Sequence, residues 1–173
     1  MAEARIVLSD ASPLIALAAA GVFDLLRALF GSVTVTATVR REVLAGKGRP
    51  GDRELREAIR AGWVRVQRAR PPDPQLADLD EGEATTLAAA APLGARCLVL
   101  IDDPLARRRA RALGLSIVGT AGVLLIAKKR RLIPAVRPLL EALMNRDFRL
   151  SAQVVAAVLE EAGEAPELRP KKG

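Results

Sequence analysis

Short apolar runs alternate along the chain with longer segments rich in Ala and Leu. The short runs carry many β-branched residues, which is typical of strands buried in a sheet. Strands are predicted at residues 5–9, 33–36, 97–101 and 115–118, with residues 63–66 as a candidate edge strand. Helices are predicted at residues 13–20, 22–30, 38–45, 53–61, 83–91, 105–113, 121–129 and 135–145, and in the segment 151–163. This alternation predicts an α/β three-layer sandwich with a central, mainly parallel sheet of four to five strands.

Length and hydrophobic content indicate a single domain. The chain has 173 residues, 50% of them hydrophobic, which is enough for one compact domain with a core of its own. We expect that domain to span residues 1–163 and residues 164–173 to form a disordered tail. Pro71, Pro72 and Pro74 each remove a backbone donor, so the segment before residue 83 is predicted to be an exposed loop.

The composition excludes several kinds of chemistry. The chain has no His, which excludes Ser-His-Asp hydrolysis and most zinc sites. Cys97 is the only cysteine and lies in the apolar run "CLVLI", so it is expected to be a buried core residue, consistent with a reducing cytoplasm. Asp10 interrupts the first apolar run, and no stretch reaches the roughly 18 apolar residues that span a bilayer. We therefore expect a cytoplasmic protein without a signal peptide or a membrane span.

The excess of basic residues suggests a polyanionic partner. Lys and Arg number 27 against 20 Asp and Glu, a net charge of +7, which favours a nucleic acid. The segment "ARRRARA" contributes Arg107, Arg108, Arg109 and Arg111, and "KKRR" contributes Lys128 to Arg131. Such residues bind phosphates without reading bases, although they can equally well solvate the outer face of a helix. Aromatic residues make up only 2% of the chain, so little base stacking is expected.

Acidic residues follow two of the predicted strands. Asp10 comes directly after the first strand, and Asp102 and Asp103 follow the strand 97–101. The carboxyl ends of parallel strands meet at one edge of a sheet, where ligands bind in open α/β folds. Glu42 in a helix after the second strand, and Glu83 at the start of an Ala-rich helix, can join them there.

Each acid also has a purely structural explanation. Asp10 suits a turn before a helix capped by Ser12, and Asp102 or Asp103 suits the N-cap position before Pro104. Glu83 can complement a helix dipole, and Glu42 can face water.

A real cluster would need a counter-charge. Two carboxylates ~4 Å apart repel by about 4 kcal/mol at an effective dielectric constant near 20. With no His and no suitably placed Lys in these segments, a divalent cation is the simplest partner, and oxygen ligands favour Mg²⁺ or Mn²⁺. Such an ion activates water for attack on a phosphodiester, which fits a polyanionic substrate.

Five segments together resemble a known family. They are, in order, "IVLSDASPLIAL", "VTVTATVRREVL", "LDEGEATTLAAAA", "CLVLIDDPLARRRARALGL" and "VGTAGVLLIAKKRRLI". Their order and spacing resemble the PIN-domain nucleases, in particular a prokaryotic group of PIN-like proteins of unknown function that is related to the toxin ribonucleases of toxin–antitoxin pairs. The resemblance covers residues 6–133, and the segment "FRLSAQVVAAVLEEAGE" is in keeping with that group.

The resemblance implies a PIN-like sandwich with a metal-dependent endoribonuclease site. By position, the implied acids are Asp10, Glu42, Glu83, where many relatives have Asp, and Asp102, whose role Asp103 can share or take. Asp10 and Asp102 would hold Mg²⁺ or Mn²⁺, and Glu42 and Glu83 would complete the ligand set or orient water. Ser12 and Thr120 resemble small polar residues that border the family's site.

The resemblance also implies partners, and it leaves one alternative open. RNA is the implied substrate, a small antitoxin is an implied partner, and a homodimer is an implied assembly. The alternative is a PIN-like module that is catalytically weak or inactive and binds RNA or a protein.

Overall fold

The computed structural model describes residues 5–71 and 73–164. These residues fall into two compact units, one ending at Thr120 and the other beginning at Ala121. The expectation of one domain over residues 1–163 stays a prediction, and residues 165–173 of the predicted tail lie outside the described residues.

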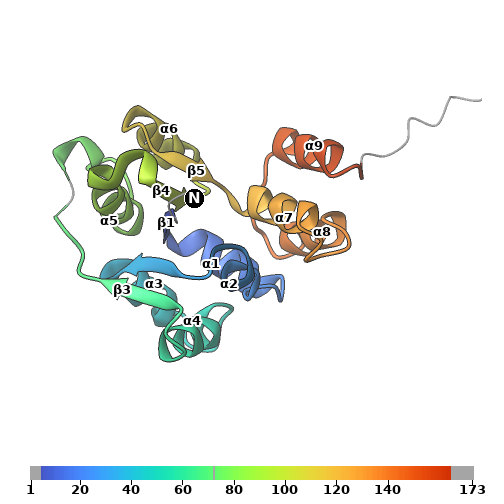
Figure 1. Ribbon diagram of the computed structural model, residues 1–173, viewed down its shortest axis with the longest axis horizontal. Coiled ribbons are helices and arrows are strands. Elements are labelled where there is room, and N and C mark those ends of the chain that lie inside the picture. The colour runs from blue at the N-terminus through green and yellow to red at the C-terminus, as the bar shows by residue number, and fades with distance from the viewer. Residues whose placement is uncertain (1–4, 72, 165–173) are drawn as a thin grey trace, which may run out of the picture. The chain divides into compact units, whose positions relative to one another are not determined.

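The first unit is built on a sheet of five strands, all parallel, in the order β3-β2-β1-β4-β5 (Figure 1). The strands are β1 (Ile6–Ser9), β2 (Val33–Thr36), β3 (Val64–Gln67), β4 (Cys97–Leu100) and β5 (Ser116–Val118). Their positions confirm the predicted α/β fold class and the predicted strands. The candidate edge strand at residues 63–66 corresponds to β3 (Val64–Gln67), which stands at one end of the strand order.

Helices connect the strands. The first unit contains α1 (Ala11–Ala19), α2 (Leu25–Phe30), α3 (Ala37–Ala45), α4 (Asp52–Arg60), α5 (Glu81–Ala90) and α6 (Pro104–Ala112), with 3-10 turns at Pro74–Leu76 and Ala91–Arg96. The second unit contains α8 (Arg137–Met144), α9 (Ala152–Glu161) and all but the first residue of α7 (Thr120–Lys129). Four predicted starts are off by two residues or more: α1 begins at Ala11 and α8 at Arg137, α2 begins at Leu25, after a turn that follows Gly21, and α5 begins at Glu81, because Asp80 occupies the N-cap.

The direction in which the chain adds strands to the sheet reverses between β1 and β4. The chain runs outward from β1 to β2 and β3, then returns to the other side of β1 with β4 and β5. Because crossovers between parallel strands are right-handed, the two directions place helices on both faces of the sheet. Packing of α5 against β1, β2 and β4 covers the centre of one face. In open sheets of this kind, ligands bind beside the carboxyl ends of the strands that flank the reversal.

The core of the first unit lies around the two central strands. Successive residues of a strand point to opposite faces, yet Val7 and Leu8 are both buried, so helices cover both sides of β1. A cluster of buried side chains around Leu8 includes Val99 of β4 and Leu87 of α5. Cys97 is also fully buried, which confirms its predicted place in the core.

Replacing Leu8 with Ala is expected to lower the free energy of unfolding by about 2–5 kcal/mol, because the smaller side chain would leave a cavity in the fully buried core around β1. Ile6→Ala in the same strand is the matched control, since Ile6 is 41% exposed, and it should cost less than about 1 kcal/mol. Urea unfolding measures both values. Equal losses would contradict the assigned orientation of β1.

Candidate functional site

The carboxyl ends of β1 and β4 carry the first two acids of the site. The strands pair in parallel, with Ser9 opposite Leu100, and the backbone N–H of Asp10 donates to the carbonyl of Leu100 at 3.0 Å. Asp10 therefore leaves β1 beside the point where Asp102 follows β4. Asp10 is only 4% exposed and Asp102 is half-buried. The sequence prediction that these two acids share one sheet edge is confirmed by the strand order.

The surroundings of Asp10 disfavour its charged form. Burial raises the pKa of Asp10 to about 6, and the charges of Glu42 and Asp102 act in the same direction. The backbone amides of Ala11 and Ser12 oppose this rise in the pKa. Ser12, predicted to border the site, thus contributes its backbone N–H, and its side chain is exposed. These charges lie close enough to Asp10 to affect its proton affinity.

Glu42 reaches the same place from α3. Its Oε2 and Asp10 Oδ1 both lie close to Gly82: a Cβ at Gly82 would be 2.6 Å from the first atom and 3.1 Å from the second. Partial desolvation, followed by the charges of Asp80 and Glu81, raises the pKa of Glu42. The absence of a side chain at Gly82 leaves the space between the two carboxylates open.

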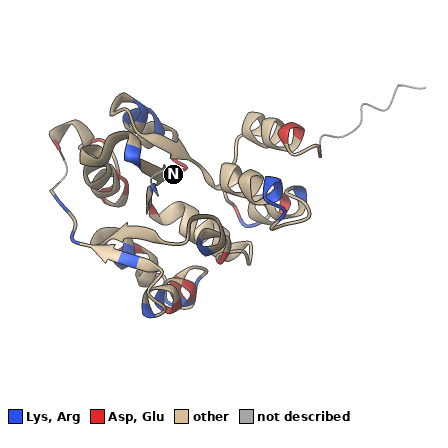
Figure 2. Ribbon diagram, in the orientation of Figure 1, with Lys and Arg blue, Asp and Glu red and all other residues tan. Residues whose placement is uncertain are grey.

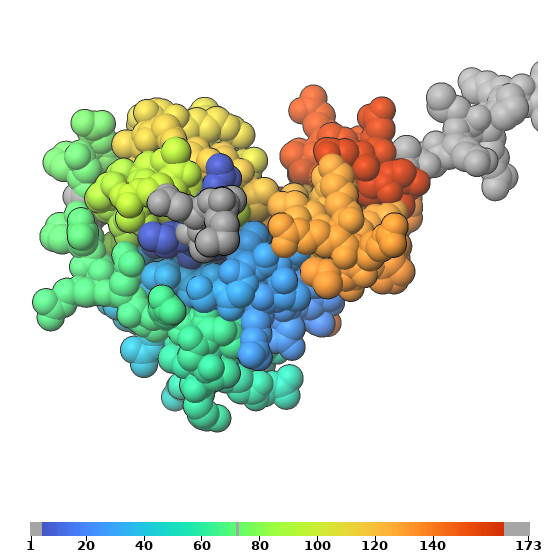
Figure 3. All heavy atoms as spheres, viewed as in Figure 1, coloured from blue at the N-terminus to red at the C-terminus, as the bar shows by residue number. Residues whose placement is uncertain are grey.

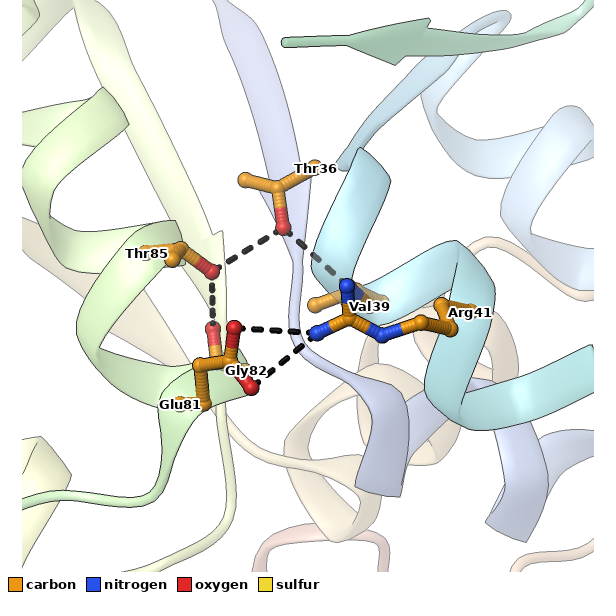
Figure 4. A network of polar contacts seen from close by, with 6 residues as sticks. All are labelled: Thr36, Val39, Arg41, Glu81, Gly82 and Thr85. Carbon is orange, nitrogen blue, oxygen red and sulfur yellow. Dashed lines mark hydrogen bonds and ion pairs between the residues drawn. The ribbon is translucent and has the colours of Figure 1, made fainter. Parts of the chain in front are cut away.

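A buried network fixes α3 against α5 (Figure 4). Thr36 caps α3 by accepting from Val39 N at 3.2 Å, and its hydroxyl lies 3.1 Å from that of Thr85. Thr85 in turn donates to the carbonyl of Gly82 at 3.1 Å, so the hydrogen between the two hydroxyls comes from Thr36. The network couples the start of α3 to Gly82 and thereby places Glu42 relative to the first turn of α5.

An exposed ion pair joins the same two helices. Arg41 donates to both carboxylate oxygens of Glu81 at 2.9 and 3.0 Å (Figure 4). A pocket of about 320 Å³ opens beside this pair and is lined by Thr38, Arg41, Glu42, Asp80, Glu81 and Gly82. The acids Asp80 and Glu81 thus belong to the surroundings of the site, although the sequence analysis did not single them out.

Glu83 has a structural role as well as a place in the site. Asp80 and Glu83 form a capping box at the start of α5, in which Glu83 accepts from Asp80 N at 3.3 Å. Burial raises the pKa of Glu83 to about 7, and the charges of Asp10 and Asp103 add to the rise. The spacing D-x-x-E at residues 80–83 is the sequence pattern that could have located both the helix start and Asp80.

The neighbours Asp102 and Asp103 have different partners. Asp103 caps α6 by accepting from Ala106 N at 2.8 Å. Asp102 accepts from both the backbone N–H of Thr120, at 2.7 Å, and its hydroxyl, at 2.6 Å. Two strong contacts from Thr120 therefore hold the carboxylate of Asp102 in one orientation.

Arg107 brings a positive charge to the same end of β4. Its guanidinium donates to the carbonyl of Ile101 at 2.9 Å, and the charge of Asp102 acts on it. A Cβ at Gly119 would lie 2.8 Å from Asp102 Oδ1 and 3.0 Å from the Arg107 Nη1, so Gly119 leaves room for both groups. Burial lowers the pKa of Arg107, with a further contribution from Arg111. The sequence analysis placed Arg107 on α6 but did not place its charge beside Asp102.

Two further arginines of α6 have different surroundings. Arg108 is exposed, and Arg109 forms an ion pair with Asp78 at 2.6 Å. Figure 2 shows the basic residues along α6.

The acids of the site are of one chemical kind. All are carboxylates, the oxygen donors that Mg²⁺ and Mn²⁺ prefer. Within residues 5–71 and 73–164, no three Asp, Glu or Cys side chains are close enough together to hold a metal ion as they stand. Gly82 leaves room for Asp10 and Glu42, and burial together with the charges of neighbouring acids raises the pKa of Asp10 and of Glu83. The donor set therefore fits a hard divalent cation.

Comparison with known proteins identifies the class. A family model described as PIN domain matches residues 6–164, and the chain belongs to this family. PIN domains are typically nucleases and generally use divalent metal ions. The match confirms the family resemblance seen in the sequence.

Other comparisons are more distant. A PilT N-terminus domain protein from the hyperthermophilic archaeon Sulfolobus solfataricus P2 is similar, at 15% identity and a TM-score of 0.43, over 68% of this chain and 89% of that one. No curated protein matches the chain. None of the helices in the described part of the chain combines the length and apolar character needed to cross a bilayer.

Asp10→Asn is expected to stabilise the protein at pH 8 in the absence of divalent ions. The folded pKa of about 6 lies above the ordinary 3.8, so the folded state binds a proton more tightly than the unfolded state. Stability is therefore lost as pH rises from about 4 through 6. The variant should gain up to about 3 kcal/mol at pH 8 and much less at pH 4.5. Denaturant unfolding in EDTA at both pH values measures the difference.

Asp24→Asn is the matched control for that measurement, because the side chain of Asp24 is exposed. We expect it to change stability equally at both pH values. A variant Asp10→Asn that is less stable than the wild type at pH 8 would contradict the assigned environment of Asp10.

Proposed function

We propose that the protein is a Mg²⁺- or Mn²⁺-dependent endoribonuclease. The observation that carries the proposal is that Asp10 and Asp102 leave the paired strands β1 and β4 side by side, and that burial, together with the charges of neighbouring acids, raises the pKa of Asp10 and of Glu83. Carboxylates that repel one another in this way are balanced most simply by a divalent cation. Membership of a family that is typically nucleolytic supports the same conclusion.

Asp10 and Asp102 would hold the cation, with Glu42 and Glu83 completing the set. Bound there, a divalent cation lowers the pKa of water and stabilises negative charge on a phosphate. Thr120 fixes Asp102 through two hydrogen bonds, so this carboxylate needs little reorganisation to act as a ligand. The network of Thr36 and Thr85 holds Glu42 opposite Asp10.

Two groups would also act on the attacking water and on the substrate. Glu83, with a pKa of about 7, exchanges a proton near neutral pH and can accept one from the attacking water. Arg107 places a positive charge beside Asp102, where it can bind a phosphate oxygen of the substrate. Asp103 remains in its role as the cap of α6.

RNA is the proposed substrate. The net charge of +7 and the exposed Arg108 on α6 favour contacts to the phosphate backbone without base specificity. A role as the toxin of a toxin–antitoxin pair extends this proposal, with a small antitoxin and a second copy of the chain as partners, in the cytoplasm. These extensions are supported by the family resemblance of the sequence.

Cleavage of end-labelled RNA in Mg²⁺, Mn²⁺ or EDTA tests the proposal. Asp10→Asn and Asp102→Asn should each lower the rate by about 10²–10³-fold, because each removes a charged ligand of the cation that stabilises the transition state. Glu42→Gln and Glu83→Gln should cost about 10–100-fold. Asp103→Asn should have a smaller effect, and the control Asp24→Asn should have none.

Binding measurements identify the alternative. A folded protein that binds RNA but cleaves it with neither ion, and that shows no change in melting temperature with Mg²⁺ or Mn²⁺, would replace the nuclease with an RNA-binding module. A folded protein that binds no RNA would leave the protein-binding module instead.

Gly82→Ala is expected to lower cleavage by at least about 10-fold, because the new methyl group would force Glu42 away from Asp10. Gly46→Ala is the matched control, since a Cβ there makes only ordinary contacts at 3.5 Å. Circular dichroism checks that both variants fold. Full activity in Gly82→Ala would show that the spacing of these two carboxylates does not matter for the reaction.

A further inference from the structure

The basic segment "KKRR" begins in the last turn of α7, within the second unit. Lys128 and Lys129 are the last two residues of this helix. A pocket of about 440 Å³ beside them is lined by Lys128, Arg131, Leu132, Ile133 and Pro134. Cations grouped beside an open pocket are the type of surface that binds a phosphate backbone.

Two acids pair with these lysines: Glu161, the last residue of α9, and Glu164, which follows it closely. Lys128 Nζ donates to Glu164 Oε1 at 2.6 Å and to the carbonyl of Ala162 at 2.6 Å. Lys129 forms an ion pair with Glu161. Figure 3 shows the atoms of α9, in red, directly against the orange atoms of the same unit. Each lysine therefore has a carboxylate where a phosphate would otherwise bind.

Glu164 is held more firmly than an ordinary surface acid. Its two carboxylate oxygens accept from the backbone amides of Val136 at 2.7 Å and Arg137 at 2.9 Å, at the start of α8. The Arg137 side chain donates to the backbone carbonyl of Glu164. Although burial acts in the opposite direction, the hydrogen bonds from Lys128 and the two amides lower the pKa of Glu164 to about 2. Glu164 thus stays charged throughout the physiological pH range.

The two ion pairs differ in strength. The side chains of Lys128 and Glu164 are 24% and 14% exposed, so solvent screens this pair little. Those of Lys129 and Glu161 are 52% and 59% exposed, and such a pair contributes little to stability. Glu164 is therefore the anchor, and Glu161 adds a second masking charge that a polyanion can displace.

We propose that Glu161, at the end of α9, and Glu164, three residues further on, form an acidic latch. This latch competes with RNA for Lys128 and Lys129. With the latch closed, these lysines are neutralised within the chain and contribute little to RNA binding. With the latch open, they bind the phosphates of single-stranded RNA. The latch rests on RNA as the ligand in the proposed function, but it does not require that the protein cleaves RNA.

Binding of a single-stranded RNA in EDTA tests the latch without any contribution from cleavage. The double variant Glu161→Gln/Glu164→Gln keeps the size of both side chains and removes their charges, although the new side-chain amide oxygen at position 164 can accept from only one of the two α8 amides. It should bind about 10-fold more tightly at about 0.1 M salt, and freeing two cations should steepen the slope of log K against log[salt] by about 1.4.

Glu141→Gln/Glu160→Gln is the matched control, since it removes the same charge from two exposed acids of the same unit. The control should leave the salt slope unchanged. Adding Lys128→Gln/Lys129→Gln should cancel the gain of the latch variant, whereas the same lysine substitutions in the wild-type chain should have little effect.

Each outcome decides the proposal. A latch variant that binds no more tightly than the control, or whose gain survives the lysine substitutions, overturns it. If the latch variant binds RNA as expected but the protein does not cleave RNA, only the proposed nuclease activity is wrong. If the protein cleaves RNA but the latch variant does not change RNA binding, only the latch is wrong.

Discussion

The parallel pairing of β1 with β4 is the constraint on which the site depends. These strands are neighbours in the sheet although β2 and β3 lie between them in the chain. The pairing is possible because both strands are apolar enough to be covered on both faces. As a consequence, Asp10 and Asp102 leave the sheet at one edge, next to each other. Disrupting this register would separate the two acids without altering either one.

Bringing acids together has an electrostatic cost, and the protein stabilises them only in part. Asp102 accepts two hydrogen bonds from Thr120 and has Arg107 nearby, whereas Asp10 has only the nearby backbone amides to oppose burial. Asp10 and Glu83 therefore have pKa values near neutrality. The second unit shows the opposite solution, since Lys128 and Glu164 neutralise each other within the chain. Among the described residues, Asp10 and Glu83 have no such partner, so it is at this site that an external cation would be needed.

Two of the acids also cap helices, and this explains why capping and function were hard to separate. Asp103 caps α6, and Glu83 completes the capping box of α5. A helix N-terminus favours carboxylates because of its free N–H groups and its dipole. A cation-binding site favours them for their oxygen atoms. The same residue type at the same end of a strand or helix satisfies both demands, so residue identity alone does not distinguish the two roles.

The sequence by itself determined the fold class, the strands and the acids at the strand ends, because hydrophobic periodicity and helix caps depend on neighbouring residues. It located Asp10, Glu42, Glu83 and Asp102 correctly on their elements. It did not separate Asp102 from Asp103, and it did not identify Gly82, Asp80 or the position of the Arg107 charge. It also showed "KKRR" without the acids that neutralise Lys128 and Lys129. Only the tertiary structure decided these points, because each depends on the approach of side chains from segments far apart in the chain, and on burial, which no local pattern encodes.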